Sequence, residues 1–135
     1  MKTISVILLS CLCIELSPAL TEVTHFTIEE AKCLATNVYH EARGEPWKGQ
    51  VAVARVTLNR GGNICEEVYR YKQFSWTLKP KLVTDTKAYY KAFLASHEAL
   101  LNPLECTHYH TTKVKPKWRK KLEPCAIINK HIFYK

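Results

Sequence analysis

The stretch Tyr39-His40-Glu41-Ala42-Arg43-Gly44-Glu45-Pro46 marks the end of an amphipathic helix and a sharp turn of the chain. Small and apolar residues precede it at three- and four-residue intervals, which at about 100° per residue place them on one helix face. These residues are Ala31, Leu34, Ala35 and Val38. Because Gly44 and Pro46 favour helix ends, we expect the helix to stop near Arg43 and the chain to form a corner there.

Glu41 is the candidate for acid chemistry in this stretch. It follows Leu34 by seven residues, so its side chain points about 20° away from that of Leu34, at the edge of the buried face. Burial disfavours a charged carboxylate and raises its pKa, which suits a general acid working near neutral pH. The alternative is an ordinary surface glutamate paired with Arg43 or Lys48.

Further segments downstream resemble, in the same order, those of one known family. They are Gly49-Gln50-Val51-Ala52-Val53-Ala54, Leu58-Asn59-Arg60, Gln73-Phe74-Ser75-Trp76-Thr77, Thr107-His108-Tyr109-His110, Pro116 with Trp118, and His131-Ile132-Phe133-Tyr134. Together with Glu41 to Pro46 they resemble the SleB-type cell wall hydrolases, the spore cortex-lytic enzyme family. The resemblance covers about residues 31 to 135. It implies an α+β, lysozyme-like domain whose helical core and short antiparallel sheet flank a groove for a glycan strand.

The resemblance also implies a reaction. A peptidoglycan lytic transglycosylase cleaves between N-acetylmuramic acid and N-acetylglucosamine without a cofactor, and here Glu41 would donate the proton and take one back. A lysozyme-type hydrolase would instead need a second carboxylate. Glu45 is the nearest such residue, although Gly44 and Pro46 leave its direction open. The alternative outside enzymes is a basic wall- or membrane-binding module without activity.

Aromatic and polar residues that follow the acid are the candidates for sugar binding. A glycan groove needs flat rings that cover the apolar faces of sugars, and amide or hydroxyl groups that bond their edges. The candidates are Gln73, Ser75, Trp76, Tyr109 and His110. For each aromatic residue alone, packing in the core is an equally good interpretation.

We expect no metal site. His40-Glu41 could begin a zinc-protease helix, but that motif requires a second histidine where this chain has Gly44. The cysteines contain no Cys-x-x-Cys pair after residue 19, which argues against a structural zinc cluster. His108, His110 and His131 are therefore expected to be neutral and hydrogen-bonded.

The first 19 residues predict export. A basic start, an apolar run from Ile4 to Ile14 and small residues near Ala19 are typical of a signal peptide, with a lipoprotein box or a signal anchor as alternatives. We therefore expect a catalytic domain over residues 20–135 that is secreted or periplasmic, with anchoring to a membrane through its amino terminus as the alternative. The four remaining cysteines predict two disulfides, with three connectivities open. We expect Cys33 to pair with Cys65.

The charge of +8 and pI of about 9.2 favour polyanionic partners. Export points to peptidoglycan rather than nucleic acid, and we expect a monomer. Lysines and arginine crowd residues 113–121. This basic segment is either a solvated loop or a contact surface for an anionic membrane or wall polymer.

Local patterns predict the elements. Thr27 and Glu30 form a capping box for a helix to about Arg43. Residues 47–60 alternate as a strand would, but the family resemblance makes them a helix. A short helical turn is expected at 66–71, and a helix capped by Asp85 to about Leu101. Alternation over 107–112 and the apolar run 126–134 predict two or three antiparallel strands.

Overall fold

The computed structural model describes residues 26–135. The predicted signal peptide or anchor, residues 1–19, lies outside the described residues. Within the described part of the chain, no helix is long and apolar enough to cross a membrane.

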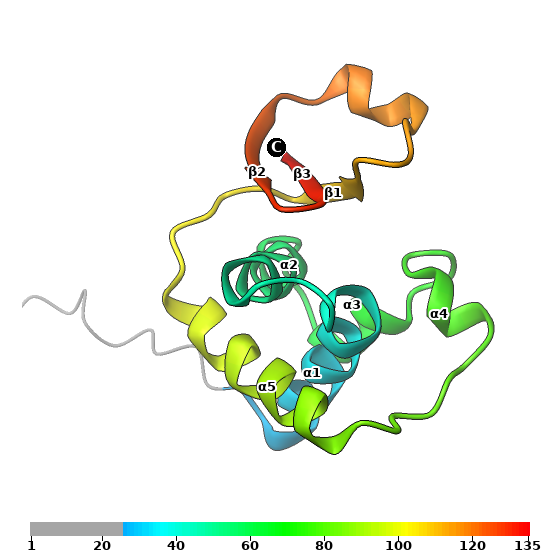
Figure 1. Ribbon diagram of the computed structural model, residues 1–135, viewed down its shortest axis with the longest axis vertical. Helices are drawn as coiled ribbons and strands as arrows, with labels where there is room; N and C mark the ends of the chain where they lie inside the picture. Colours follow the sequence, from blue (N-terminus) through cyan, green and yellow to red (C-terminus); the bar gives the residue numbers. More distant parts are fainter. Residues whose placement is uncertain (1–25) are drawn as a thin grey trace, which may run out of the picture.

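Three helices form the body of the molecule: α1 (Ile28–Ala42), α2 (Trp47–Asn59) and α5 (Thr86–Glu98), which continues as the 3₁₀ turn η2 (Ala99–Leu101). The capping box at the start of α1 is confirmed. The Thr27 hydroxyl accepts a hydrogen bond from the backbone N–H of Glu30, and the Glu30 carboxylate accepts one from the backbone N–H of Thr27. Asp85 caps α5 as predicted. α1 packs against α2, α3 and α5 (Figure 1).

α2 is a helix, although its sequence alternates. It lies at the centre of the fold, with residues on all of its sides buried: Gly49, Gln50, Val51, Ala52, Val53, Ala54, Val56 and Thr57. A helix that is covered all round carries no amphipathic period. This explains why its sequence pattern alone could not separate helix from strand.

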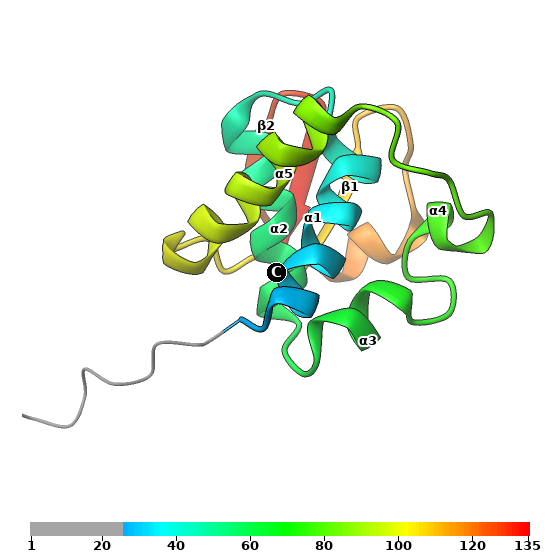
Figure 2. The ribbon, with the colours of Figure 1, turned by 90° about the horizontal axis from the view of Figure 1, so that it is seen from below.

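Two short helices lie between α2 and α5. α3 (Ile64–Tyr69) begins two residues before the predicted turn, because the Asn63 side chain accepts a hydrogen bond from the Glu66 N–H and caps it there. α4 (Ser75–Leu78) was not predicted. Four residues are too few to show a helical period. Figure 2 shows α4 at the edge of the molecule, on the connection from α3 to α5.

Three antiparallel strands form a small sheet: β1 (His108–Thr111), β2 (Pro124–Ile128) and β3 (His131–Tyr134), in the order β1-β3-β2. The sheet lies on one side of α2 (Figure 1). β2 and β3 are joined by a turn in which Asn129 has a left-handed backbone (φ 48°). The basic segment between β1 and β2 contains a 3₁₀ turn, η3 (Lys117–Lys121). The α+β prediction is confirmed.

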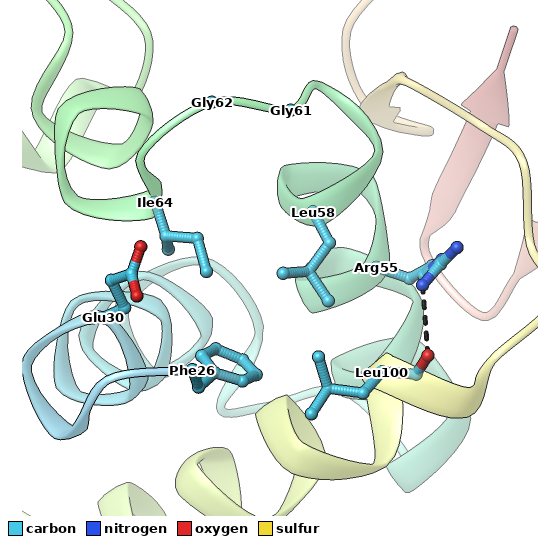
Figure 3. A pocket seen from close by; sticks show the side chains of 8 residues that line it. All are labelled: Phe26, Glu30, Arg55, Leu58, Gly61, Gly62, Ile64 and Leu100. Carbon is cyan, nitrogen blue, oxygen red and sulfur yellow. Dashed lines mark hydrogen bonds between the residues drawn. The ribbon is translucent and has the colours of Figure 1, made fainter. Parts of the chain in front are cut away.

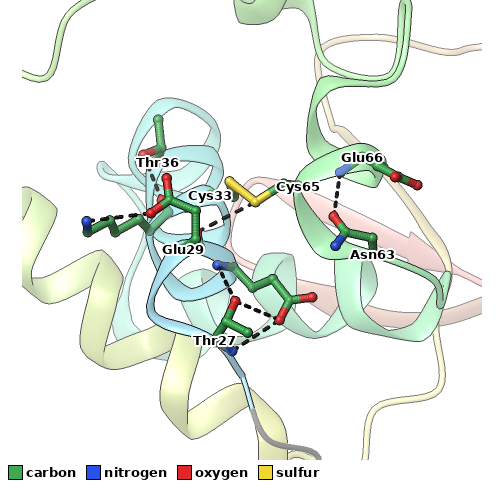
Figure 4. Close-up of a disulfide and its surroundings, with 9 residues drawn as sticks. Thr27, Glu29, Cys33, Thr36, Asn63, Cys65 and Glu66 are labelled. Atoms are coloured by element: carbon green, nitrogen blue, oxygen red, sulfur yellow. Dashed lines mark hydrogen bonds and ion pairs between the residues drawn. A yellow bond between two sulfur atoms is a disulfide. The ribbon is translucent and has the colours of Figure 1, made fainter.

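Two disulfides fix the elements to one another. Cys33 of α1 pairs with Cys65 of α3, as predicted (Figure 4). Cys106, just before β1, pairs with Cys125 of β2. The first bond therefore ties α3, which leads toward the Gln73 segment, to the helix that carries Glu41.

Candidate active site

Glu41 lies in the last turn of α1, half-buried, and faces the sheet. The Tyr109 hydroxyl of β1 donates a hydrogen bond of 3.1 Å to its Oε2. Burial raises the pKa of Glu41 above that of an ordinary glutamate; the Tyr109 hydrogen bond and the Arg60 charge oppose this without cancelling it. The carboxyl group is thus held in one orientation and keeps its proton to a higher pH than a solvated glutamate does.

A cavity of about 270 Å³ opens next to Glu41. It lies between the end of α1, the end of α2, the segment before α4, and the sheet. Its lining residues are Glu41, Arg60, Lys72, Gln73, Phe74, Ser75, His108, Tyr109 and Trp118. Glu41, Gln73, Ser75 and Tyr109, all singled out from the sequence, are brought together here.

A network of charged side chains holds one wall of this cavity. The Arg60 guanidinium donates to the Thr107 carbonyl at 2.8 Å and to the buried Glu67 carboxylate at 3.2 Å. Arg70 donates to the same carboxylate at 2.9 Å and to the Gln73 side-chain oxygen at 2.7 Å. The amide nitrogen of Gln73 is therefore the end of that side chain available to a ligand.

Trp76 and His110 lie in the interior and do not line the cavity. The Trp76 ring stacks on His40 at 4.5 Å between ring centroids, and its N–H donates to Asn37 at 3.0 Å. His110 contacts the Tyr134 hydroxyl at 3.0 Å and the Thr111 carbonyl at 2.8 Å. The His110 ring stacks on the Tyr134 ring, and His110 is absent from the residues that line the cavity.

Glu45 does not line the cavity either. It is 9% exposed, and its Oε2 accepts from the Asn129 side chain at 2.8 Å and from the Lys130 N–H at 3.5 Å, with His131 Nδ1 at 3.6 Å. Burial alone would raise the pKa of Glu45, but the Asn129 hydrogen bond, the nearby His131 and the Lys130 N–H hold it below the ordinary value. The two glutamates therefore occupy different environments.

Other residues of the cavity had no role assigned from the sequence. Arg60 and Trp118 belong to segments that resemble the SleB-type family, but only the tertiary structure shows where their side chains lie. Trp118 belongs to η3 and lies 5.3 Å from the His108 ring, between centroids. Burial lowers the pKa of His108, so its neutral form is favoured. Lys72 has a left-handed backbone (φ 60°) in the turn that presents Gln73.

A larger cavity, of about 400 Å³, lies between the start of α1, the end of α2 and the 3₁₀ turn η2, and Glu41 does not line it (Figure 3). Its carboxylate, Glu30, is used in the capping box. Its cation, Arg55, donates to the carbonyls of Ala99 and Leu100 at 3.3 Å each. Because Glu30 and Arg55 already form these hydrogen bonds within the fold, the larger cavity is a weaker candidate for acid–base chemistry than the cavity beside Glu41. No cluster of metal-ligating side chains occurs among the residues described.

The model of one family, described as Cell Wall Hydrolase, matches residues 44–134. The chain belongs to this family. The matched range begins three residues after Glu41, so the family match itself does not cover the acid.

Two similar curated proteins are spore cortex-lytic enzymes. The one from Bacillus subtilis is 57% identical over 35 residues, 26% of this chain and 12% of that protein. The one from Oceanobacillus iheyensis is 46% identical over 44 residues, 33% of this chain and 16% of that protein. The matched segments thus span only a small part of these relatives.

Solved structures resemble a much larger part of the chain. The catalytic domain of Bacillus cereus SleB has a TM-score of 0.70 with 27% identity, covering 83% of this chain and 94% of that one. The catalytic domain of Bacillus anthracis SleB, described as a germination-specific lytic transglycosylase, has a TM-score of 0.71 with 27% identity, covering 83% and 98%. The chain therefore has the lysozyme-like fold of these catalytic domains.

Proposed function

We propose that this protein cleaves the glycan strand of peptidoglycan between N-acetylmuramic acid and N-acetylglucosamine, as a lytic transglycosylase with Glu41 as its acid and base. One observation carries the proposal: Glu41 is the single carboxylate among the described residues that line its cavity, and its pKa is raised. Membership in the cell wall hydrolase family and the likeness to the two SleB domains support the choice of substrate.

The reaction needs one carboxyl group used twice. Protonated Glu41 donates its proton to the glycosidic oxygen, and the bond from that oxygen to C1 of the muramoyl sugar breaks. The resulting carboxylate then removes the proton of the muramoyl 6-hydroxyl, whose oxygen bonds to C1. The product is a 1,6-anhydro ring, Glu41 is protonated again, and no water is consumed.

Tyr109 supports both steps. Its hydroxyl donates to Glu41 Oε2, which favours the carboxylate form produced by the first step and fixes the direction of the second oxygen. Burial raises the pKa of Tyr109 well above its ordinary value, so the hydroxyl keeps the proton that it donates. Gln73, Ser75 and Trp118 are proposed to contact the sugars. Trp76 and His110 are proposed to support the walls from behind.

Mass spectrometry of digested, purified peptidoglycan tests this function. We expect muropeptides with 1,6-anhydromuramoyl ends. Reducing muramoyl ends would show lysozyme-type hydrolysis instead, and an absence of cleavage would support the non-catalytic binding module. Glu41→Gln is the matched control, because it shows whether any cleavage comes from a contaminating enzyme.

The disulfides fit an extracellular protein, and we propose that the protein acts outside the cytoplasm on the wall. We further propose that the basic segment contacts anionic wall polymer. No cation of this segment forms an ion pair with the acidic side chains of the described residues. Trp118, within the segment, lines the cavity, so a polymer held there would lie close to the cleavage site.

A further inference from the structure

Glu45 is a buried carboxylate that the proposed reaction does not use. It lies two residues before the start of α2 and four residues after Glu41. Its carboxylate has three partners at the tip of the β2–β3 hairpin: the Asn129 side chain and the Lys130 N–H of the turn, and the His131 ring at the start of β3. A carboxylate at a helical corner therefore holds the tip of a hairpin that lies more than eighty residues further along the chain.

The tip of this hairpin pairs with the strand that carries Tyr109 and contacts the Tyr109 ring. Thr111 of β1 pairs with His131, and the Thr112 N–H donates to the Lys130 carbonyl at 2.8 Å. The Tyr109 and His131 rings lie on one face of the sheet with their centroids 5.3 Å apart, edge to face. A displacement of the hairpin tip would therefore displace the Tyr109 ring.

The other end of β1 is held separately. Arg60 donates to the Thr107 carbonyl at 2.8 Å, and Asn59 donates to the Cys106 carbonyl at 2.8 Å. The strand is thus fixed to the helical body at both ends, by Arg60 and Asn59 near Thr107 and by Glu45 near Thr111. Tyr109 lies between these two attachments, and its hydroxyl reaches Glu41.

We propose that Glu45 is a positioning residue: by holding the Asn129–His131 turn, it keeps the Tyr109 hydroxyl on Glu41, and it is not a second catalytic carboxylate. This role of Glu45 presupposes the proposed function, but the experiment that tests it does not require the protein to be active. The position of Tyr109 can be read from the titration of Glu41 in a protein that is not turning over.

Asn129→Gly is the variant that tests the proposal. It removes the hydrogen bond to Glu45 without changing any charge, and glycine accepts the left-handed backbone at this position. Lys130→Ala is the matched control, because it truncates an exposed side chain in the same turn. Tyr109→Phe removes the hydrogen bond to Glu41 directly.

The readout is the titration of the Glu41 carboxyl carbon by ¹³C NMR. The titratable and charged groups that face Glu41 are Tyr109 and His108 of β1, Arg60 at the end of α2, and Lys72 of the following loop. Asn129→Gly and Lys130→Ala leave all four in place. Because the Tyr109 hydrogen bond lowers the pKa of Glu41, its loss should move the titration midpoint upward in Tyr109→Phe, and its loosening should do the same in Asn129→Gly.

The double variant Asn129→Gly/Tyr109→Phe should shift no further than Tyr109→Phe, since both changes act through one hydrogen bond. Turnover of Asn129→Gly on peptidoglycan should fall roughly two- to tenfold, about what the loss of one hydrogen bond costs. An Asn129→Gly titration that superimposes on those of the wild type and Lys130→Ala would overturn the proposal.

A second variant, Glu45→Gln, tests whether Glu45 is a catalytic carboxylate. A neutral side chain here removes a negative charge, which by itself would lower the pKa of Glu41. Retention of most turnover in Glu45→Gln excludes a catalytic carboxylate at this position, and the Gln side-chain oxygen can still accept from Asn129. Loss of all cleavage while Glu41 titrates as in the wild type would instead make Glu45 a catalytic carboxylate. If the wild type itself cleaves nothing, the proposed function fails, but the titrations still decide the role of Glu45.

Discussion

Burial of the Glu41 carboxyl group has a consequence for stability as well as for chemistry. A carboxyl group whose pKa is higher in the folded state destabilises that state when it is ionised. The penalty is absent below the unfolded pKa, about 4.3, and is fully present once the pH exceeds the folded pKa. Glu41 should therefore cost the protein stability at neutral pH.

We predict that Glu41→Gln melts at a higher temperature than the wild type at pH 7, because the amide is never charged. The difference should shrink as the pH is lowered through the pKa of Glu41 and vanish near pH 4. Thermal melts of both proteins across this range provide the measurement. A constant difference, or a less stable variant at pH 7, would mean that the carboxylate is well solvated.

The direction of a side chain could be predicted from the sequence where the helical period determines it. The spacing from Leu34 placed Glu41 at the edge of the buried face, which the structure confirms. Arg60, Lys72 and Trp118 reach the cavity only through contacts between distant segments, which no local pattern contains.

At the scale of elements, the ends of helices were easier to predict than their interiors. Thr27 and Asp85 carry the capping side chains that start α1 and α5, and both caps are formed. The interior of α2 was ambiguous because burial on all sides removes the helical period. α4 was missed because a single turn leaves almost no sequence pattern.

The disulfides hold these elements, and thiol chemistry tests them. In the protein exported to an oxidising compartment, thiol labelling should find none of Cys33, Cys65, Cys106 and Cys125 free. Reduction should lower the melting temperature, since each closed loop stabilises by roughly 2–4 kcal/mol. Four reactive thiols in this protein would contradict the disulfide pairing.

The whole molecule carries an excess of positive charge, and the basic segment concentrates part of it beside Trp118. The quadruple replacement of Lys115, Lys117, Lys120 and Lys121 by Gln should weaken binding to whole walls and flatten the salt dependence of that binding, because salt screens exposed charges. Cleavage of short soluble glycan fragments should be almost unchanged. Sedimentation with walls and fragment turnover are the two measurements.

Replacing four exposed lysines elsewhere by Gln is the matched control for net charge: Lys79, Lys81, Lys87 and Lys91. Wall binding should fall less in this variant. Equal loss in both variants would mean that only total charge matters. A collapse of fragment cleavage in the first variant would place the basic segment within the active site.

Glu41 is the one acid of the proposed reaction. Its most direct test is the rate at which purified Glu41→Gln releases soluble fragments from peptidoglycan, compared with the wild type. We predict a loss of roughly 10²–10⁴-fold or more, the usual cost of removing a general acid and base, with the fold intact by circular dichroism. Release by Glu41→Gln at near the wild-type rate would contradict the account.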